Sequence, residues 1–372
     1  ADAIKNNGDN AYLICGNKRT GSNWDFYLFD ILTKPVRGMT GLMLKKFGHH
    51  FFDASFYCTL KIICWIKKRI SSGEKVIFHF HNMQCANFNI GLLCSFARKH
   101  DVKIVYTFHD CWPMSGGCSY WTFENCKKWA DVNGCIKCPL KFPNSRRELL
   151  FKEKSLLSAD AVVVSPCQWM DDLVGQSHLK SLKHIIIYNG IDTNFWIYPF
   201  DSEKRLDKIN LVAVASPWAE RKGLKFLNEL STFLPPNYSL TVVGLSDEDK
   251  TDRNIKRIGK VNKESLKSIY CNSDILVNPT LEDNFPTVNI EALLCGLQIC
   301  SFNTGGSPEI YDNNTGVTCD QKTAESLWNS IKVINVSPIK RSACRSRGLG
   351  FSLDKMERRY LALYKELTSV FD

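Results

Sequence analysis

Short apolar runs alternate with longer helical patterns along this 372-residue chain, and this alternation limits the fold more than any other feature. The runs are mostly apolar on both faces, which is typical of parallel strands covered by helices. The segments between them are long enough for the crossovers that parallel strands require. In the first part of the chain, the predicted strands span residues 11–15, 75–81, 104–109, 161–165 and 184–188.

A second series of strands and helices follows a turn at residues 189–192 and a connector that contains Pro199. We therefore expect an α/β protein with two Rossmann-like, doubly wound domains that face each other across a cleft. The predicted strands of the second series span residues 210–215, 239–243, 255–258, 275–278 and 298–301, with helices such as 222–233 and 262–271 between them.

The boundaries of the predicted domains follow from this pattern. The first domain spans 1–195 and carries a Cys-rich insert at 111–139, and the second spans 196–351. The chain opens on what resembles the tail of a helix, so we expect the first domain to lack its first strand. Residues 352–372 contain an amphipathic helix, 354–368, which we expect to cross back to the first domain.

Composition narrows the choice of partners. Lys and Arg outnumber Asp and Glu by 48 to 38, and the formal net charge of +10 favours phosphates, nucleotides, lipid headgroups or nucleic acid. With 44% hydrophobic and 23% charged residues, the chain is not a disordered one. The longest nearly apolar stretch, 56–66, contains Lys61 and is shorter than the ~18 residues of a membrane-spanning helix.

The loop and helix after the strand 275–278 are candidates for a ligand site, because ligands of open α/β sheets bind beyond the carboxyl ends of strands. Asp283 lies in this loop and Glu291 in the first turns of the helix, so both can face one cleft. The backbone amides at the helix start can bind an anion; a capped helix with a dipole-stabilising Glu is an equal alternative. The other candidates in this stretch are Glu282, Asn284, Phe285, Pro286, Thr287 and Val288.

Two further loops of the second series contain residues that could bind a ligand. Gly305 and Gly306 follow the strand 298–301 and would allow the backbone to approach a ligand, with Glu309 beside them. Arg221 and Lys222 follow the first strand and could neutralise a diphosphate without a metal. A solvated basic turn is the alternative, and it fits Arg221 better than Lys222.

The sequence resembles the GT-B glycosyltransferases of family 4, above all those of bacterial exopolysaccharide and colanic acid synthesis. The resemblance rests on 281–309, 221–223 and 189–192, and includes two acidic residues separated by seven, with Asp283 where the family usually has Glu. It implies that Glu291 holds the ribose of a nucleotide sugar, Asp283 or Glu282 the sugar hydroxyls, and Lys222 with Arg221 the diphosphate. The usual Gly-Arg at the first strand end is replaced by residues 215–218.

The first domain offers an acceptor-facing wall. A His at a strand end can bind a sugar hydroxyl or carry a proton, although a buried structural His is as frequent. The resemblance favours a catalytic role for His109, together with Asp283 and Glu291. The acceptor-side candidates are His81, Asn82, Asp110 and Trp112, and His79 lies near them in the sequence.

The Cys-rich insert contains a second group of residues that could form a site. Cys118, Cys126, Cys135 and Cys138 are separated by seven, eight and two residues, and four thiolates can hold a structural zinc ion. Disulfides are the alternative in an exported protein and free thiols in any compartment. Similar inserts in the cytoplasmic exopolysaccharide enzymes favour zinc.

The resulting hypothesis is a retaining, hexosyltransferase-like enzyme with metal-independent chemistry. It would transfer a sugar from a nucleotide-diphosphate sugar to a saccharide acceptor, lipid-linked or free. A catalytically impaired nucleotide-sugar-binding or scaffold protein is the alternative. No segment resembles a groove-reading helix, so we expect no nucleic-acid partner. We expect a cytoplasmic protein, and the basic, aromatic segment 51–72 would permit contact with an anionic membrane at the inner face of the plasma membrane.

Overall fold

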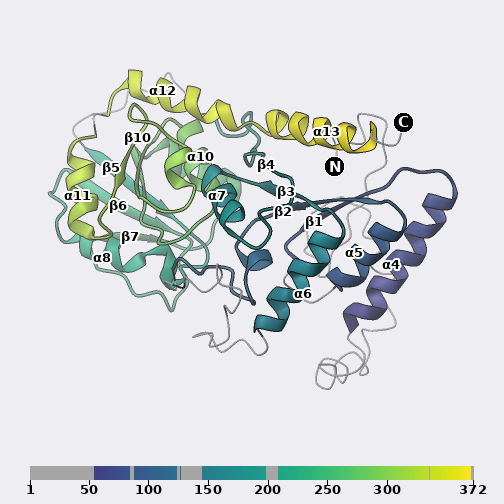
Figure 1. Cartoon of the computed structure of the whole chain (residues 1–372). Helices are drawn as coiled ribbons and strands as arrows, with labels where there is room; N and C mark the ends of the chain where they lie inside the picture. The colour runs from purple at the N-terminus through teal and green to yellow at the C-terminus, as the bar shows by residue number, and fades with distance from the viewer. Residues whose placement is uncertain are drawn as a thin grey trace.

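The computed structural model of the chain describes residues 54–83, 88–123, 126, 145–197, 208–334 and 336–369. Within these residues, two parallel sheets lie in two halves of the molecule, as predicted (Figure 1). We call the first sheet with its helices the first half, and the second sheet with its helices the second half. The predicted strand 11–15 lies outside the described residues.

The first half contains a four-stranded sheet of order β1-β2-β3-β4 in which all neighbours are parallel. Its strands are strongly apolar, and Val162–Ser165 is buried along its whole length, which is expected of a sheet with helices on its faces. None of its described helices is long and apolar enough to cross a membrane. The elements are α4 (Ala54–Ser71), β1 (Ile77–His81), α5 (Ile90–Lys99), β2 (Lys103–Thr107), η3 (Trp112–Met114), α6 (Ser145–Ser158), β3 (Val162–Ser165), α7 (Gln168–Gln176) and β4 (His184–Ile186).

The second half contains a six-stranded parallel sheet of order β10-β9-β8-β5-β6-β7. The sequence did not predict β10, which is a short edge strand. The strands are β5 (Ile209–Val214), β6 (Tyr238–Val243), β7 (Ile255–Ile258), β8 (Ile275–Asn278), β9 (Gln298–Phe302) and β10 (Gly316–Cys319). The helices are η5 (Glu220–Lys222), α8 (Leu224–Ser231), α9 (Lys263–Cys271), α10 (Thr287–Leu294), η6 (Ser307–Glu309), α11 (Ala324–Lys332), α12 (Pro338–Gly348) and η7 (Leu349–Phe351), and the last helix of the described chain, α13 (Leu353–Ser369), follows the second half.

Helix α13 returns from the second half and covers the first sheet (Figure 1). Leu363 and Leu367 pack in one buried cluster with Val105, Val162 and Val164. At the crossing point, Ile191 pairs with Ser352 in a parallel bridge, and the N–H of Leu353 donates to the Ile191 carbonyl (2.9 Å). The chain therefore passes between the halves twice, at adjacent positions.

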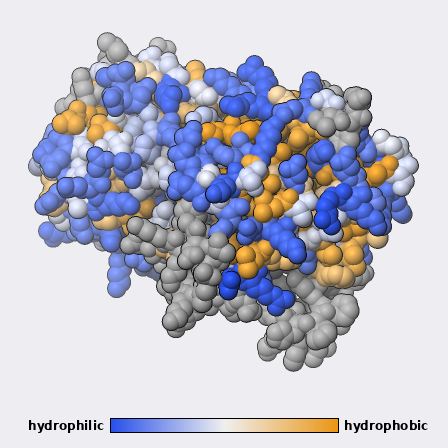
Figure 2. Space-filling view, in the orientation of Figure 1, coloured by the Kyte–Doolittle hydropathy of each residue, from blue (hydrophilic) through white to orange (hydrophobic). Residues whose placement is uncertain are grey.

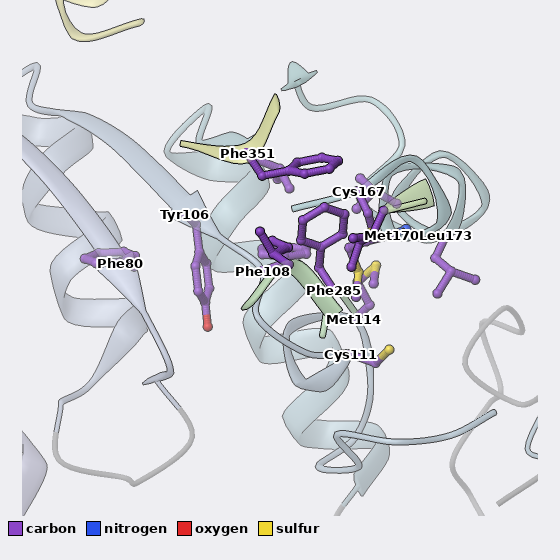
Figure 3. Packing of buried hydrophobic residues seen from close by; sticks show 14 of the residues in the cluster. Phe80, Tyr106, Phe108, Cys111, Met114, Cys167, Met170, Leu173, Phe285 and Phe351 are labelled. Atoms are coloured by element: carbon purple, nitrogen blue, oxygen red, sulfur yellow. Dashed lines mark hydrogen bonds between the residues drawn. The ribbon is translucent and has the colours of Figure 1, made fainter. Parts of the chain in front are cut away.

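The largest apolar cluster continues from one half into the other. Phe285 of the second half stacks on Tyr188 of the first, with ring centroids 5.3 Å apart, and meets Phe351 edge-on at 5.5 Å. Figure 3 shows Phe285 and Phe351 close to Cys167 and Met170 of the first half. These contacts bring the carboxyl ends of β2 and β3 toward the loops that follow β5, β8 and β9.

Candidate functional site

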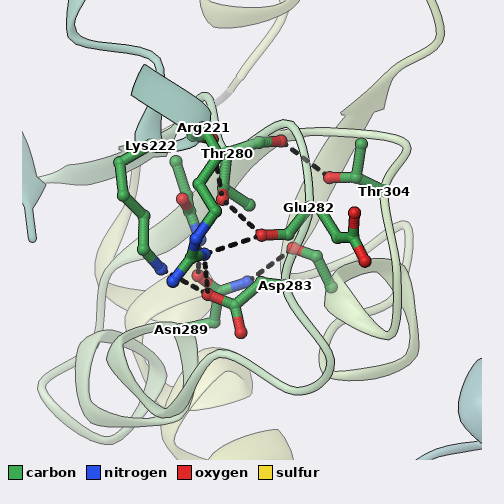
Figure 4. Close-up of polar contacts among 9 residues, drawn as sticks. Arg221, Lys222, Thr280, Glu282, Asp283, Asn289 and Thr304 are labelled. Atoms are coloured by element: carbon green, nitrogen blue, oxygen red, sulfur yellow. Dashed lines mark hydrogen bonds and ion pairs between the residues drawn. The ribbon is translucent and has the colours of Figure 1, made fainter. Parts of the chain in front are cut away.

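Two cations and one carboxylate meet where β5 and β8 end (Figure 4). Arg221 and Lys222 lie in η5, and the Lys222 ammonium forms an ion pair with the Asp283 carboxylate. The Arg221 guanidinium lies 4.0 Å from the same carboxylate and donates to the Glu282 carbonyl (2.9 Å). All three side chains are partly exposed, so the group is accessible to a ligand. Two positive charges against one negative charge leave the site positive.

Backbone contacts between three loops build the floor of this site. The N–H of Leu281 donates to the Arg221 carbonyl (2.7 Å), and the Thr304 hydroxyl donates to the Thr280 carbonyl (2.8 Å). Gly305 has φ +54°, and a Cβ there would lie 1.7 Å from the Asp283 carbonyl oxygen. At Gly306 a Cβ would lie 2.2 Å from the Asn284 carbonyl oxygen. The paired glycines thus allow the loop after β9 to approach the loop after β8, and their predicted contact with a ligand stays a prediction.

Helix α10 begins a few residues after Asp283. Pro286 is its N-cap residue, and no described side chain accepts a hydrogen bond from its first turn. Thr287 is exposed and Val288 partly exposed, so the first amides of the helix are available for an anion. One turn further, the Glu291 carboxylate accepts a hydrogen bond from the Tyr270 hydroxyl (3.3 Å). Burial raises the pKa of Glu291 to about 7.

The structure places Glu282 differently from Asp283. Its carboxylate is 1% exposed and accepts a hydrogen bond from the Phe123 N–H of the first half (2.5 Å). Figure 4 shows this side chain pointing away from Lys222. Adjacent residues of an extended loop point to opposite sides, so only one of the two carboxylates can face the cations. Asp283 takes that position, and the role of Asp283 or Glu282 in binding the donor sugar stays a prediction.

Glu309 is also engaged away from the cations. Its two carboxylate oxygens accept from the N–H groups of Gln168 and Trp169, each at 2.8 Å, so Glu309 caps the N-terminus of α7 in the first half. The buried ring of Phe285 fills the junction between the halves. The Asn284 carbonyl accepts from the Cys167 thiol (3.1 Å). Glu309, Phe285 and Asn284, all predicted to bind the donor, thus form contacts between the two halves.

Three histidines gather at the carboxyl ends of β1 and β2. His81 Nδ1 lies 2.8 Å from His109 Nε2, a distance that requires one of the two nitrogens to carry the hydrogen. The His79 ring contacts the His81 ring and bonds to the hydroxyls of Tyr364 (2.6 Å) and Thr107 (2.8 Å). Burial lowers the pKa values of all three histidines, that of His81 to about 4. His109 is therefore neutral near pH 7 and able to accept a proton.

The remaining acceptor-side candidates are Asp110, Trp112 and Asn82, and they differ in how accessible they are to an acceptor. Asp110 is buried, and its carboxylate accepts from the Trp112 N–H (2.8 Å), which fixes the turn after β2. The Trp112 ring lies under the Lys152 ammonium at 3.7 Å, a cation–π contact. Asn82 is exposed and has φ +44°. Of these residues, Asn82 is the one most available to an acceptor.

The predicted zinc site falls largely outside the described residues. Cys135 and Cys138 are not described, and Cys118 and Cys126 are partly buried. Among the described residues, no three His, Cys, Asp or Glu side chains are close enough to hold a metal ion. The zinc site stays a prediction.

The second half matches a known family. Residues 194–349 match the family model described as glycosyl transferases group 1. This stretch contains both cations, Asp283 and the whole of α10. Residues 194–349 form a glycosyltransferase group 1 domain.

Similar proteins cover most of the chain. The chain is 24% identical to the Escherichia coli K12 protein named as a colanic acid biosynthesis glycosyl transferase, WcaC, over 78% of this chain and 76% of that one. The structure of sucrose-phosphate synthase from Thermosynechococcus elongatus superposes with a TM-score of 0.61 at 17% identity, covering 85% of this chain and 79% of that one. Anabaena HepE in complex with UDP gives 0.61 at 15% identity, covering 94% and 98%. The predicted GT-B fold is confirmed.

Several residues around the glycosyltransferase group 1 domain were not predicted. Tyr120 of the first half lies under the Arg221 guanidinium at 3.9 Å, and Tyr270 pairs with Glu291. Trp218, in the segment that replaces Gly-Arg, turns inward and donates to the Val243 carbonyl (3.0 Å). Tyr120 lies in the Cys-rich insert, where no strand or helix pattern indicates its neighbours. The spacing of Tyr270 on α9 was compatible with a buried face, but its partner was not evident.

Proposed function

We propose that this chain is a retaining glycosyltransferase that transfers a sugar from a nucleotide-diphosphate sugar to a saccharide acceptor. The observation that carries the proposal is the placement of Arg221 and Lys222 beside Asp283, in the loop that leads into the N-terminus of α10. Fixed cations and helix amides at one point suit a diphosphate, whose charge grows as the sugar leaves. The Lys222 ammonium would exchange Asp283 for a phosphate oxygen when the donor binds.

The proposed reaction uses the residues as follows. The bond between the anomeric carbon and the diphosphate oxygen breaks, an acceptor oxygen bonds to the same carbon, and the acceptor proton leaves with the diphosphate. Asp283, released from Lys222, would accept hydrogen bonds from sugar hydroxyls, and Glu291 from ribose hydroxyls. His109, neutral and at the end of β2, would bind a hydroxyl from the opposite side.

The finer parts of the proposal rest on similarity. The resemblance to family 4 implies that the anomeric configuration of the sugar is retained and that no metal ion takes part in the reaction. Arg221 and Lys222 would stabilise the charge of the leaving diphosphate, as a metal ion does in other enzymes. The name of the E. coli relative supports a role in exopolysaccharide, capsule or lipopolysaccharide synthesis. The UDP and UDP-glucose complexes of Anabaena HepE make UDP-sugars the first donors to test. We place the boundary between the domains near residue 195.

The proposal is tested by donor turnover. Purified protein is incubated with UDP- and GDP-sugars, with and without a bacterial glycolipid extract, and released nucleotide diphosphate is measured. We expect Lys222→Ala to lower turnover by about 100-fold, because a charge-stabilising group is lost. Lys256→Ala, an exposed lysine on the edge strand β7, is the matched control and should keep full activity. Equal turnover by both variants would reject the proposed role of the site.

The same samples separate the enzyme from the binding or scaffold alternative. A scaffold would show a donor-dependent rise in melting temperature but no turnover with any donor or acceptor. Elemental analysis of the purified protein tests for zinc, and one equivalent per chain would support the quartet of Cys118, Cys126, Cys135 and Cys138.

We also propose contact of the first half with an anionic membrane. Phe56 and Leu60 of α4 and Leu150 and Phe151 of α6 are exposed large apolar side chains. Figure 2 shows hydrophobic residues gathered over the side of the molecule where these helices lie in Figure 1. Cosedimentation with vesicles of anionic and of neutral lipids tests this contact, and binding only to anionic vesicles is expected.

A further inference from the structure

A loop of the first half is docked on the proposed donor site. This loop, residues 111–123, follows β2 and reaches the loop after β8. The Phe123 N–H donates to the Glu282 carboxylate, and the Cys111 thiol lies 3.9 Å from the other oxygen of the same group. Because Glu282 is almost completely buried, water cannot easily replace these contacts. The end of the loop therefore has a fixed place relative to Asp283.

Tyr120 is the residue of this loop that lies against the cations. Its ring is 3.9 Å from the guanidinium carbon of Arg221, within the range of a cation–π contact. On the other side, the same guanidinium donates to the Glu282 carbonyl (2.9 Å). A long, flexible Arg side chain is thus held between a ring from one half and a carbonyl from the other.

The ring also limits where Arg221 can go. Its guanidinium lies 4.0 Å from the Asp283 carboxylate, which already pairs with Lys222. Without the ring, Arg221 could close on Asp283, and part of the positive charge available to an incoming diphosphate would be neutralised. Stacking on the flat face of the ring keeps the guanidinium beside the carboxylate and leaves its edge for a phosphate.

We propose that Tyr120 is a positioning residue for donor binding: it holds Arg221 in place for the diphosphate, so that the first half forms one wall of the donor site. This inference rests on the proposed function. Tyr120 does not itself touch the reacting atoms, and its effect passes through Arg221.

The test compares two substitutions in the full chain. Tyr120→Phe keeps the ring and should leave the donor KM within about 2-fold of the wild type. Tyr120→Leu removes the ring and should raise the donor KM by about 3- to 30-fold, the range of a partly buried cation–π contact, while kcat changes less than about 3-fold. UDP-glucose and GDP-mannose are the donors used, and affinities for UDP and GDP are measured by calorimetry.

A double-mutant cycle separates positioning from general structure. In an Arg221→Ala background, Tyr120→Leu should have no further effect on donor affinity, since the group that it positions is gone. Tyr238→Leu removes a partly buried tyrosine that packs edge-on against Trp328 in the second half, and serves as the matched control. It should leave the donor KM unchanged.

Three results would overturn the inference. The first is a Tyr120→Leu variant with wild-type donor KM in a protein that turns over donor, which leaves the proposed function intact. The second is an equal penalty with and without Arg221, which assigns Tyr120 a purely structural role. The third is a wild-type chain that neither binds UDP or GDP nor turns over any donor, which rejects the proposed function together with the inference.

Discussion

The carboxylate of Glu309 accepts a hydrogen bond from the backbone N–H of Gln168, 141 residues earlier in the chain (2.8 Å). Its second oxygen binds the next amide, so a residue of the second half supplies the negative charge at the N-terminus of α7. Glu309 therefore joins the two halves, and its predicted role in donor binding stays a prediction.

We expect Glu309→Ala to lower the free energy of unfolding by about 1–3 kcal/mol, because two helix amides lose a charged acceptor. Urea unfolding followed by circular dichroism measures the change. Glu325→Ala, at an exposed position in the first turn of α11, is the control and should change stability by less than about 0.5 kcal/mol. If Glu309→Ala instead kept full stability and raised only the donor KM, the result would contradict this role and support the predicted role in donor binding.

The raised pKa of Glu291 predicts a pH-dependent penalty. Burial holds the folded pKa at about 7, above the ordinary value of 4.5, so between these values the folded state keeps a proton that the unfolded state has lost. Stability therefore falls as pH rises through this window, and the charged form costs up to about 3 kcal/mol above it. Glu291→Gln should match the wild type near pH 4.5 and exceed its stability at pH 8.

The same substitution should harm function. An ionised carboxylate is the better acceptor for ribose hydroxyls, so the wild-type donor KM should fall as pH rises from 6 to 8. In Glu291→Gln this dependence should vanish and the donor KM should be high throughout. The donor KM of the wild type and of Glu291→Gln, measured as a function of pH, tests this prediction. Parallel profiles would exclude Glu291 as the titrating group.

The histidine cluster predicts loss of stability in acid. Burial, the largest cause, and the neighbouring His81 and His109 lower the pKa of His79 well below 6.5. Below pH 6.5 the histidines of the unfolded chain bind protons that the folded cluster does not bind, so the free energy of unfolding decreases as the pH falls below 6.5. We expect His79→Gln to flatten the melting-temperature profile between pH 5 and 7. His100→Gln, outside the cluster, should leave the slope as it is in the wild type.

A buried ion pair anchors α12 to the second sheet. Arg341 pairs with Asp274, whose other oxygen accepts from the Asn210 N–H (2.8 Å). Asp274→Ala should lower the free energy of unfolding by about 3–5 kcal/mol, because a buried guanidinium loses its counter-charge. Replacing both partners, as Asp274→Leu with Arg341→Met, should recover most of this loss. Urea unfolding of the wild type and both variants tests this, and a cost below about 1 kcal/mol for Asp274→Ala would contradict it.

The pattern of apolar runs predicted the sheets well because buried parallel strands leave a strong local signal. Strand Gly316–Cys319 was missed because it is only 4 residues long, begins with Gly and lies at a sheet edge. The amphipathic spacing of residues 354–368 predicted a helix, but it carries no information about which sheet the helix covers.

The candidate site was predicted in part for a related reason. Arg221, Lys222 and Asp283 were predicted because each follows a predicted strand in the sequence, and these residues lie together in the structure. Sequence could not decide between Glu282 and Asp283, since the choice depends on the Phe123 amide of a distant loop. Contacts between halves leave no periodic pattern, so the roles of Glu309 and Tyr120 became evident only in three dimensions.

Helix α13 also affects how the protein can be made. Leu363 and Leu367 cover Val105, Val162 and Val164, yet they are synthesised after the entire second half. On the ribosome, this apolar face of the first sheet lacks its partner helix until the last part of the described chain emerges. The nascent chain must therefore carry an unfinished first half for most of translation, and chaperones that bind exposed apolar strands should associate with it during that interval.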